Sequence, residues 1–522
     1  MACNHQKSLL NEYHMLELRN NFLEEENKYL KYEYQLLQSR NQTLNNKLAQ
    51  QQQIIEKRFE KEKEDYQKII DNKDLEIARL KSLLNNDSSN CGLPTSKTPL
   101  WKNKAIPNSR NKSSKSIGGQ HGHQKNKLYK FNDNEINDIN YIELDNCPHC
   151  HGELIETGNT IDKDVLDYKL VVVKQRKKFK EYKCVNCNQK VHAKIPNDLK
   201  EENQYGPNIK ALILDLLNEG YISINRVKKI ISGLTNNQIN LSEGYISKIQ
   251  KNSSKNLENF LNELKLEILK QKILYWDDTV VYINKKQSCL RFYGNEKLAL
   301  FKAHKHKNKE GIDEDGILNS ISENTMVMHD HNKINYNNNY TFSNIECNAH
   351  LQRDLQKVVD NLNHEWAKEL KKLITEGIDI RNKSLEKNEG TNEKFCQTFF
   401  NQFEEIMLKG IEENKQAKDK YYVDTEKTLI TRILDYKNNY FAWVTDFKIP
   451  TTNNLSERSL RSSKTKMKIS GQFQNIERAQ DYSRIKSYIE TVYRNNVNVY
   501  EALLRLVMEE PFSLDEIKSE NK

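Results

Sequence analysis

Glycine, proline and cysteine are scarce in this chain of 522 residues, with 17, 8 and 9 copies respectively. Nine cysteines are too few for a scaffold of this length held together by disulfides. No run approaches the ~18 apolar residues of a membrane-spanning helix, and the first residues lack the apolar stretch of a secretory signal. We therefore expect neither a secreted nor a membrane-spanning protein.

Apolar residues make up 36% of the chain and charged residues 30%. Even with glycine added, the apolar share stays below the ~45–50% of an average globular protein. At roughly 100–200 residues per domain, the length predicts three or four domains. We expect folded modules separated by solvated helix and linker.

The net charge of +9 is matched by one segment, residues 91–130, which contains nine cations and no acid. Proline, glycine, serine and asparagine interrupt residues 87–130, which is typical of a linker. A concentrated basic arm favours a polyanionic partner, the alternative being a merely solvated linker. The cations are Lys97, Lys102, Lys104, Arg110, Lys112, Lys115, Lys125, Lys127 and Lys130.

The first 86 residues have the heptad pattern of a coiled coil, and no glycine or proline occurs before Gly92. If the leucines that recur every seven residues occupy the d positions of the heptad, asparagine occupies three of the a positions, Asn20, Asn27 and Asn41. Asparagine at a favours a two-stranded coiled coil with a fixed register. A homodimer or a higher oligomer is therefore expected, the alternative being a long helix folded back on its own domain. The leucines that recur every seven residues are Leu9, Leu16, Leu23, Leu30, Leu37 and Leu44.

Two Cys-x-x-Cys pairs within residues 131–200 predict a zinc-binding domain of the ribbon type. Cys147 with Cys150, and Cys184 with Cys187, supply four thiolates for one tetrahedral zinc ion. A redox dithiol is the alternative, although two pairs coexist without a thioredoxin-like pattern. The β-branched run at 170–173 and the segment 177–182 predict strands, with a hairpin carrying the second pair. Nearby histidines that could replace a cysteine ligand are His149, His151 and His192.

Residues 201–256 have the pattern of three short helices, over 209–217, over 224–231 and from the N-cap Ser242. Such a trio is compatible with a helix-turn-helix DNA-binding domain. Any small helical bundle would give a similar pattern.

The chain then becomes strand-like, and two of the predicted strands end in aspartate. The strand predicted over 273–279 carries Asp277 and Asp278 near its end. The strand predicted over 326–329 is followed directly by Asp330. Further strands are predicted over 280–283, 290–293, 298–301 and 345–347. Acids on neighbouring strands repel one another unless cations lie between them, and oxygen ligands select Mg²⁺ or Mn²⁺.

A third acid, Glu457, follows Asn453 and Asn454 at the start of a predicted helix. Three carboxylates could hold two metal ions, which together promote cleavage of a phosphodiester. Because Glu457 and Lys464 lie two helical turns apart, they share a face. A cation beside a metal-binding carboxylate suits a phosphate backbone, and candidate DNA contacts are Arg458, Arg461 and Lys464.

These motifs together resemble the transposases of the insertion sequence 66 family. The segments that carry the resemblance, in chain order, are Gly118-Gly-Gln-His-Gly-His123, the two cysteine pairs, Tyr205-Gly-Pro through Leu241-Ser-Glu-Gly, Asp277-Asp-Thr, His329-Asp-His, Cys347-Asn-Ala-His350-Leu-Gln-Arg353 and Asn453-Asn-Leu-Ser-Glu-Arg458. Two positions depart from the family pattern, since His121 replaces a proline and Asp278 replaces a glutamate.

The resemblance implies an RNase H-like catalytic domain whose triad is Asp277, Asp330 and Glu457. It implies two Mg²⁺ or Mn²⁺ ions, structural Zn²⁺, and as partners the element's terminal repeats, target DNA and small companion proteins. It also implies a cytoplasmic, nucleoid-associated bacterial protein. The expected fold is multidomain α+β, divided into a coiled coil (1–86), a basic linker (87–130), a zinc-binding domain (131–200), a helical DNA-binding domain (201–256), a catalytic domain (257–510) with a helical insertion at about 351–448, and a tail (511–522).

The function expected from this resemblance is metal-dependent 3′-end cleavage and strand transfer. A DNA-binding regulator without catalysis is one alternative, but it leaves the three acids unexplained. An RNase H-like nuclease that does not join strands is another, and it would share the same active site.

Overall fold

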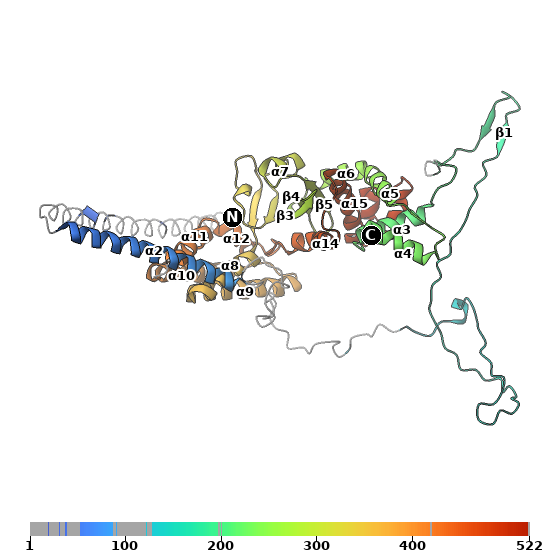
Figure 1. Cartoon of the computed structure of the whole chain (residues 1–522), viewed down its shortest axis with the longest axis horizontal. Coiled ribbons are helices and arrows are strands. Elements are labelled where there is room, and N and C mark those ends of the chain that lie inside the picture. Colours follow the sequence, from blue (N-terminus) through green and yellow to red (C-terminus); the bar gives the residue numbers. More distant parts are fainter. Residues whose placement is uncertain are drawn as a thin grey trace. The chain divides into compact units, whose positions relative to one another are not determined.

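The computed structural model describes residues 53–86, 128–196, 201–417 and 420–519, together with a few single positions outside these ranges. The chain is mixed α+β and divides into two compact units (Figure 1). The larger unit comprises Met1–Asn111, Ile195–Val227 and Ser242–Lys522, and the smaller comprises Lys112–Lys194 and Lys228–Leu241.

A five-stranded mixed sheet forms the centre of the larger unit. Its strands lie in the order β5-β4-β3-β6-β7. The first three form an antiparallel meander, while β6 and β7 run parallel to β3. The predicted meander and the short strand before the insertion are thus confirmed. The strands are β3 (Ile273–Ile283), β4 (Lys286–Gly294), β5 (Ala299–His304), β6 (Met326–His329) and β7 (Ser343–Glu346).

One strand differs from the sequence prediction, because segments 273–279 and 280–283 form a single strand, β3. Its partner β4 pairs with it without interruption from Tyr275 to Ile283. The β-branched run from Thr279 to Val281 suits such a pleated surface. Asp277 therefore lies within a strand and not at its end.

Two helices, α14 (Asn454–Ser470) and α15 (Ile476–Arg494), pack against this sheet. Phe292 and Phe301 of the sheet share a buried cluster with Leu460 of α14 and Tyr482 of α15. The backbone N–H of Phe301, on edge strand β5, donates to the Ser487 hydroxyl at 2.8 Å. Helix α15 thus covers a sheet edge that would otherwise expose unpaired backbone groups.

The predicted insertion is helical and has a core of its own. Its largest buried side chains include Trp366, Trp443, Phe399, Phe403 and Phe441. The helices are α8 (Asn348–Leu362), α9 (Glu365–Glu386), α10 (Glu393–Gln416), α11 (Lys420–Asp435), α12 (Lys437–Tyr440) and α13 (Ala442–Thr445).

The three helices expected at residues 201–256 are present as α3 (Pro207–Asn218), α4 (Ile224–Leu234) and α5 (Glu243–Lys255). Ser242 caps α5 as predicted, its hydroxyl accepting from the Tyr245 N–H at 3.1 Å. Helix α3 packs against α16 (Val499–Val507), so this segment shares a core with the C-terminal helices. The predicted tail contains α17 (Leu514–Ser519), which packs on α6 (Glu258–Ile268).

Helix α2 (Gln53–Asn85) belongs to the segment predicted as a coiled coil, and it contacts α8 and α11. Ala78 is buried there, and its carbonyl accepts from the Tyr422 hydroxyl at 2.9 Å. The leucine seam from Leu9 to Leu44 lies almost wholly outside the described residues, so the dimer stays a prediction. None of the helices described has the length and apolar character needed to cross a bilayer. Other apolar residues of α2 are exposed, among them Tyr66, Ile69, Ile70, Ile77, Leu80 and Leu84.

The smaller unit has little regular structure. Strands β1 (Glu181–Lys183) and β2 (Lys190–His192) form a hairpin that carries the second cysteine pair. Its strands differ from the predicted ones, because the segment 177–182 is a strand only at its last two residues and no strand was expected at 190–192. The strand predicted at 170–173 does not form, and Leu170, Val171 and Val173 are exposed. Between residues 131 and 196 no side chain is buried, so this β-branched run has no apolar layer to join.

Close packing of α10 on Trp366 generates a stability prediction. A Cβ at Gly410 would lie 2.9 Å from the Trp366 ring, which is fully buried and donates to Glu426 through Nε1 at 2.6 Å. Overpacking costs about 1–3 kcal/mol, more than the ~1 kcal/mol that alanine gains in a helix. Gly410→Ala should therefore lower the free energy of unfolding measured with denaturant.

The matched control is Gly244→Ala in α5, where an added Cβ meets nothing within 4 Å. This variant should be no less stable than the wild type. Equal stabilities for the two variants would contradict the assigned packing.

Candidate active site

The register of two parallel strands brings Asp277 and Asp330 together. Strand β3 pairs with β6 up to Tyr275 opposite Met328. Asp277 lies two residues after Tyr275, and Asp330 lies two residues after Met328. Side chains two residues apart share one face of a strand, so the two carboxylates reach the same edge of the sheet.

Glu457 reaches this edge from the first turn of α14 because the two ends of the insertion are joined. The Asn348 N–H donates to the Thr451 carbonyl at 3.0 Å, and its side-chain amide donates to the Tyr440 carbonyl at 2.8 Å. Asn348 begins α8, whereas Thr451 lies just before α14. The two ends of the long insertion therefore meet where Asn348 contacts Thr451. We call this junction the neck.

Asn453 completes the neck and touches the site directly. Its backbone N–H donates to the Cys347 sulfur at 3.1 Å. Its side-chain amide donates to the Trp276 carbonyl at 3.0 Å and lies 3.5 Å from Asp330 Oδ1. Asn453 is the N-cap residue of α14, but its side chain makes no cap hydrogen bond. It is used instead to hold the strand that carries Asp277.

A cavity of about 370 Å³ opens over these groups. It is lined by all three predicted acids and by two of the predicted DNA contacts, Arg461 and Lys464. Arg458 is exposed and does not line the cavity. The spacing of Glu457, Arg461 and Lys464 places them on one face of α14, as expected.

Burial and mutual repulsion make this cluster of acids electrostatically unfavourable. Burial and the negative charge of Asp330 raise the pKa of Asp277 to about 7. Burial also acts to raise the pKa of Asp330, but the contact with His350 and its positive charge hold that pKa below its usual value. Burial opposes protonation of His350, yet Asp330 and Cys347 raise its pKa to about 10.

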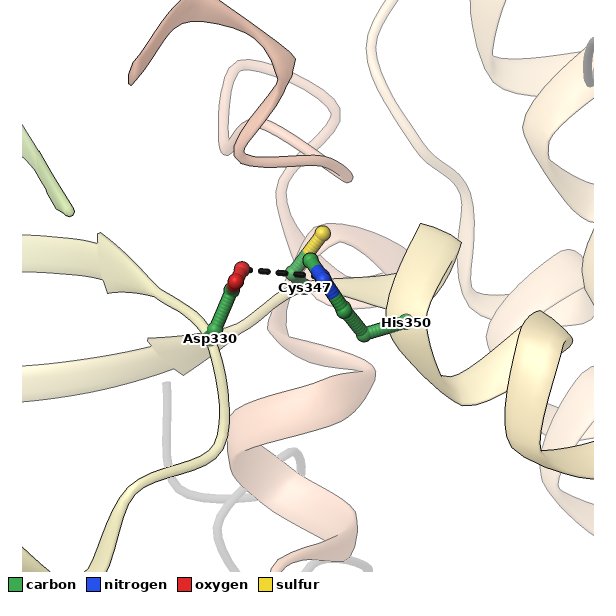
Figure 2. Close-up of side chains that lie close together, drawn as sticks. All are labelled: Asp330, Cys347 and His350. Carbon is green, nitrogen blue, oxygen red and sulfur yellow. Dashed lines mark ion pairs between the residues drawn. The ribbon is translucent and has the colours of Figure 1, made fainter. Parts of the chain in front are cut away.

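Two cationic side chains of α8 therefore compensate the acids. His350 Nδ1 lies 2.8 Å from Asp330 Oδ1 (Figure 2). Its Nε2 lies 3.7 Å from Glu457 Oε1. Arg353 Nη2 donates to the same Glu457 oxygen at 3.3 Å. His350 thus bridges the second and third acids, and Arg353, one helical turn later, pairs with the third.

A second polar network supports the loop after Asp330. The Tyr336 hydroxyl donates to the fully buried Glu346 at 2.5 Å, and His331 Nδ1 lies 2.8 Å from the same carboxylate oxygen. Asn332 caps the short 3-10 helix Lys333–Asn335. The Asn-rich loop is thereby folded against the site.

The two cysteine pairs adopt the same knuckle geometry. The Cys147 N–H donates to the Gly152 carbonyl at 3.0 Å, and the Cys184 N–H donates to the Gln189 carbonyl at 2.8 Å. In each knuckle, backbone N–H groups of the next residues lower the pKa of the first thiol, those of His149 and Cys150 in one and of Cys187 and Asn186 in the other.

The four sulfurs are not gathered into one cluster in the part of the chain that the structure describes, so the zinc site stays a prediction. The cations of the basic arm that were predicted to contact DNA lie outside the described residues. They are Lys102, Lys104, Arg110, Lys112 and Lys115.

Comparison with known families matches residues 202–481 to the model described as the Transposase IS66 family. The chain belongs to this family. The match covers α3, the whole five-stranded sheet, the insertion and α14, and so includes all three acids of the site. A search of curated proteins finds no match.

Sequence reasoning missed the roles of Asn348 and Asn453 in this transposase-family chain. Both stand inside the recognised motifs, yet asparagine before a helix ordinarily indicates a cap. His350 and Arg353 stand in the sequence only as members of one of these motifs, and the structure pairs them with the acids. A signal was available, because their spacing places them on one helix face beside the second aspartate.

The raised pKa of Asp277 predicts a stability gain for Asp277→Asn in magnesium-free buffer. Between the unfolded pKa near 4 and the folded value of about 7, the folded state binds more protons, so wild-type stability falls as the pH rises through this window. Asparagine removes the penalty. At about 1.4 kcal/mol per pKa unit, the gain above pH 7 should be roughly 2–4 kcal/mol and vanish near pH 4.

Thermal unfolding at several pH values tests this prediction. The control is Asp278→Asn, since Asp278 is compensated by Lys307 at 2.7 Å and adds less than Asp330 to the repulsion on Asp277, so its removal should give a smaller gain. Identical pH profiles for Asp277→Asn and wild type would contradict the assigned repulsion.

Proposed function

We propose that the chain is a DNA transposase that cleaves the 3′ ends of its element and joins them to target DNA. Asp277, Asp330 and Glu457 are the catalytic triad in this proposal. The observation that carries it is the convergence of these acids, from two strands and a distant helix, on one cavity that also contains cations. Membership of the family supports the same function.

The sheet supports an RNase H-like catalytic domain. Numbered along the chain, its strands lie in the order 3-2-1-4-5, with the second strand antiparallel to the first. The first and fourth strands are the central neighbours that carry the two aspartates. The third acid comes from a helix packed on the same sheet.

The donor set fits Mg²⁺ or Mn²⁺. Asp277 accepts a hydrogen bond from the Asp278 N–H at 2.8 Å and has no ion-pair partner among the described residues. A half-buried carboxylate with a raised pKa that faces two further acids is favourable for a divalent cation. Two such ions would activate the attacking oxygen and stabilise the leaving oxygen.

The chain's own residues would hold the DNA and orient the acids. Arg461 and Lys464 line the cavity beside Glu457 and suit a phosphate on either side of the scissile bond. Arg458 lies on the exposed flank of α14 and would contact the backbone further away. The basic arm would bind DNA without sequence preference, and nine phosphate contacts would give a log–log salt slope near −8 at most.

The triad predicts the outcome of three substitutions. Asp277→Asn, Asp330→Asn and Glu457→Gln keep side-chain size and remove the charge that would hold metal. Each should lower cleavage and joining of labelled element ends at least ~100-fold, because one ligand of the reacting centre is lost. Binding of the ends, measured by gel shift, should persist because other modules supply it.

The matched control is Glu477→Gln, which changes the first-turn acid of α15 just as Glu457→Gln changes that of α14. It should keep wild-type activity. Near-normal strand transfer by Glu457→Gln would refute the triad. Wild-type protein that binds the ends but never cleaves them would favour the regulator, and cleavage without joined products would favour the nuclease.

We also propose that Cys147, Cys150, Cys184 and Cys187 bind one structural zinc ion. Two knuckles of equal geometry support this, as does the complete lack of buried side chains between residues 131 and 196. A segment without an apolar core needs another source of folding energy, and zinc–thiolate bonds supply it.

Zinc content tests this proposal. Cys184→Ser should lose one equivalent of zinc, measured by elemental analysis of the full chain, and residues 131–196 should become more sensitive to protease. Cys396→Ser, which changes a thiol within α10, should lose none. An unchanged zinc content in Cys184→Ser would argue against the four-cysteine site.

The helices at residues 201–256 are proposed as the helix-turn-helix that recognises the terminal repeats. The N-terminal segment is proposed to form a homodimer or a higher oligomer, which would bring two element ends together. Small companion proteins of the element and a cytoplasmic, nucleoid-associated location complete the proposal.

A further inference from the structure

Three side chains of different chemistry meet at the start of α8. Asp330 follows β6, Cys347 is the N-cap residue of α8, and His350 lies in its first turn. A carboxylate oxygen, a sulfur and a ring nitrogen of these residues all lie within 4.8 Å of one another. Figure 2 shows the Asp330 carboxylate and the His350 ring facing each other, with the Cys347 side chain beside them.

This donor set differs from that of the proposed magnesium site. Mg²⁺ and Mn²⁺ prefer oxygen ligands, whereas thiolate and imidazole favour Zn²⁺ and related transition ions. Three protein ligands are also the usual number at zinc sites that leave one position open. Because Asp330 and His350 line the cavity, a fourth position would face it.

The surroundings of Cys347 suit a metal-bound thiolate. The sulfur accepts the Asn453 backbone N–H at 3.1 Å, and such hydrogen bonds orient and stabilise metal ligands. Cys347 also stands at the N-terminus of a helix of 15 residues, where the helix dipole stabilises negative charge. One thiolate and one carboxylate would neutralise a Zn²⁺ ion in a place where Cys347 is only 1% exposed.

We propose that Asp330, Cys347 and His350 form a second zinc site, which shares Asp330 with the catalytic centre. Zn²⁺ bound there withdraws Asp330 and His350 from their present contacts, so magnesium loses one of its ligands. Zinc at this site therefore inhibits cleavage. The inhibition rests on the proposed transposase function, whereas the binding of zinc does not.

The binding test uses the full chain and added Zn²⁺, with bound metal counted by elemental analysis after free metal is removed. Cys347→Ala should bind one zinc fewer than wild type, and Cys396→Ala should bind the same number as wild type. The double variant Cys184→Ser/Cys347→Ala should lose both equivalents. Co²⁺ in place of Zn²⁺ should give a thiolate absorption band that Cys347→Ala weakens and Cys396→Ala retains.

His350→Gln gives an independent test, because Cys347 is buried and its loss could disturb folding. This variant keeps the thiol but should also lose the second zinc. An unchanged zinc count in folded Cys347→Ala, or in His350→Gln, overturns the site.

The inhibition test titrates Zn²⁺ into a cleavage assay at fixed Mg²⁺. Removing even an outer partner of a metal site costs about 10–100-fold in affinity, so Cys347→Ala should need at least ~10-fold more Zn²⁺ for half-inhibition. An unchanged half-inhibition point overturns the blocking role. If no protein cleaves DNA while the zinc counts differ as expected, the transposase proposal fails and the zinc site stands.

Discussion

The site depends on the neck of the insertion, where two asparagines join chain segments about a hundred positions apart. Asn348 holds the start of α8 to the Thr451 and Tyr440 carbonyls, and Asn453 holds the start of α14 to Cys347 and to β3. Both are buried, where an unmade hydrogen bond is expensive. Without these bonds, Glu457 would sit on a helix whose position relative to β3 and β6 was fixed by apolar contacts alone.

Holding three acids together requires compensating charge, and α8 supplies it. His350 and Arg353 pair with Asp330 and Glu457 but leave Asp277 without a cationic partner in the described part of the chain. The pKa of Asp277 rises accordingly, while that of Asp330 falls. In the free protein, the repulsion on Asp277 can be relieved either by protonation of its carboxylate or by a bound cation. Because Asp277 has no cationic partner in the described part of the chain, it is the acid whose charged form a bound metal ion would stabilise most.

Much of this was predictable from the sequence, because the signals were local. Strands that carry or precede acids located Asp277 and Asp330, and a predicted helix start located Glu457. Local patterns also placed the meander and the Ser242 cap, but not the strands of the hairpin around Cys184. The position of Asp277 within β3 was not predictable, since it depends on how far β4 continues to pair. The role of Asn453 was missed because its tertiary contacts replace the local cap that its sequence position favours.

Two regions of the chain differ in what would stabilise their folds, so we expect different changes to unfold them. The insertion buries Trp366, Trp443 and several phenylalanines, so its fold depends on apolar packing. Residues 131–196 bury no side chain, and in the proposed zinc site the cysteine knuckles and a bound ion would supply their folding energy. Loss of the proposed zinc ion should therefore leave the sheet, the insertion and the neck intact. Because the three acids lie on the sheet and on α14, which share a buried apolar cluster, the geometry of their cavity should not depend on zinc bound by the cysteine pairs.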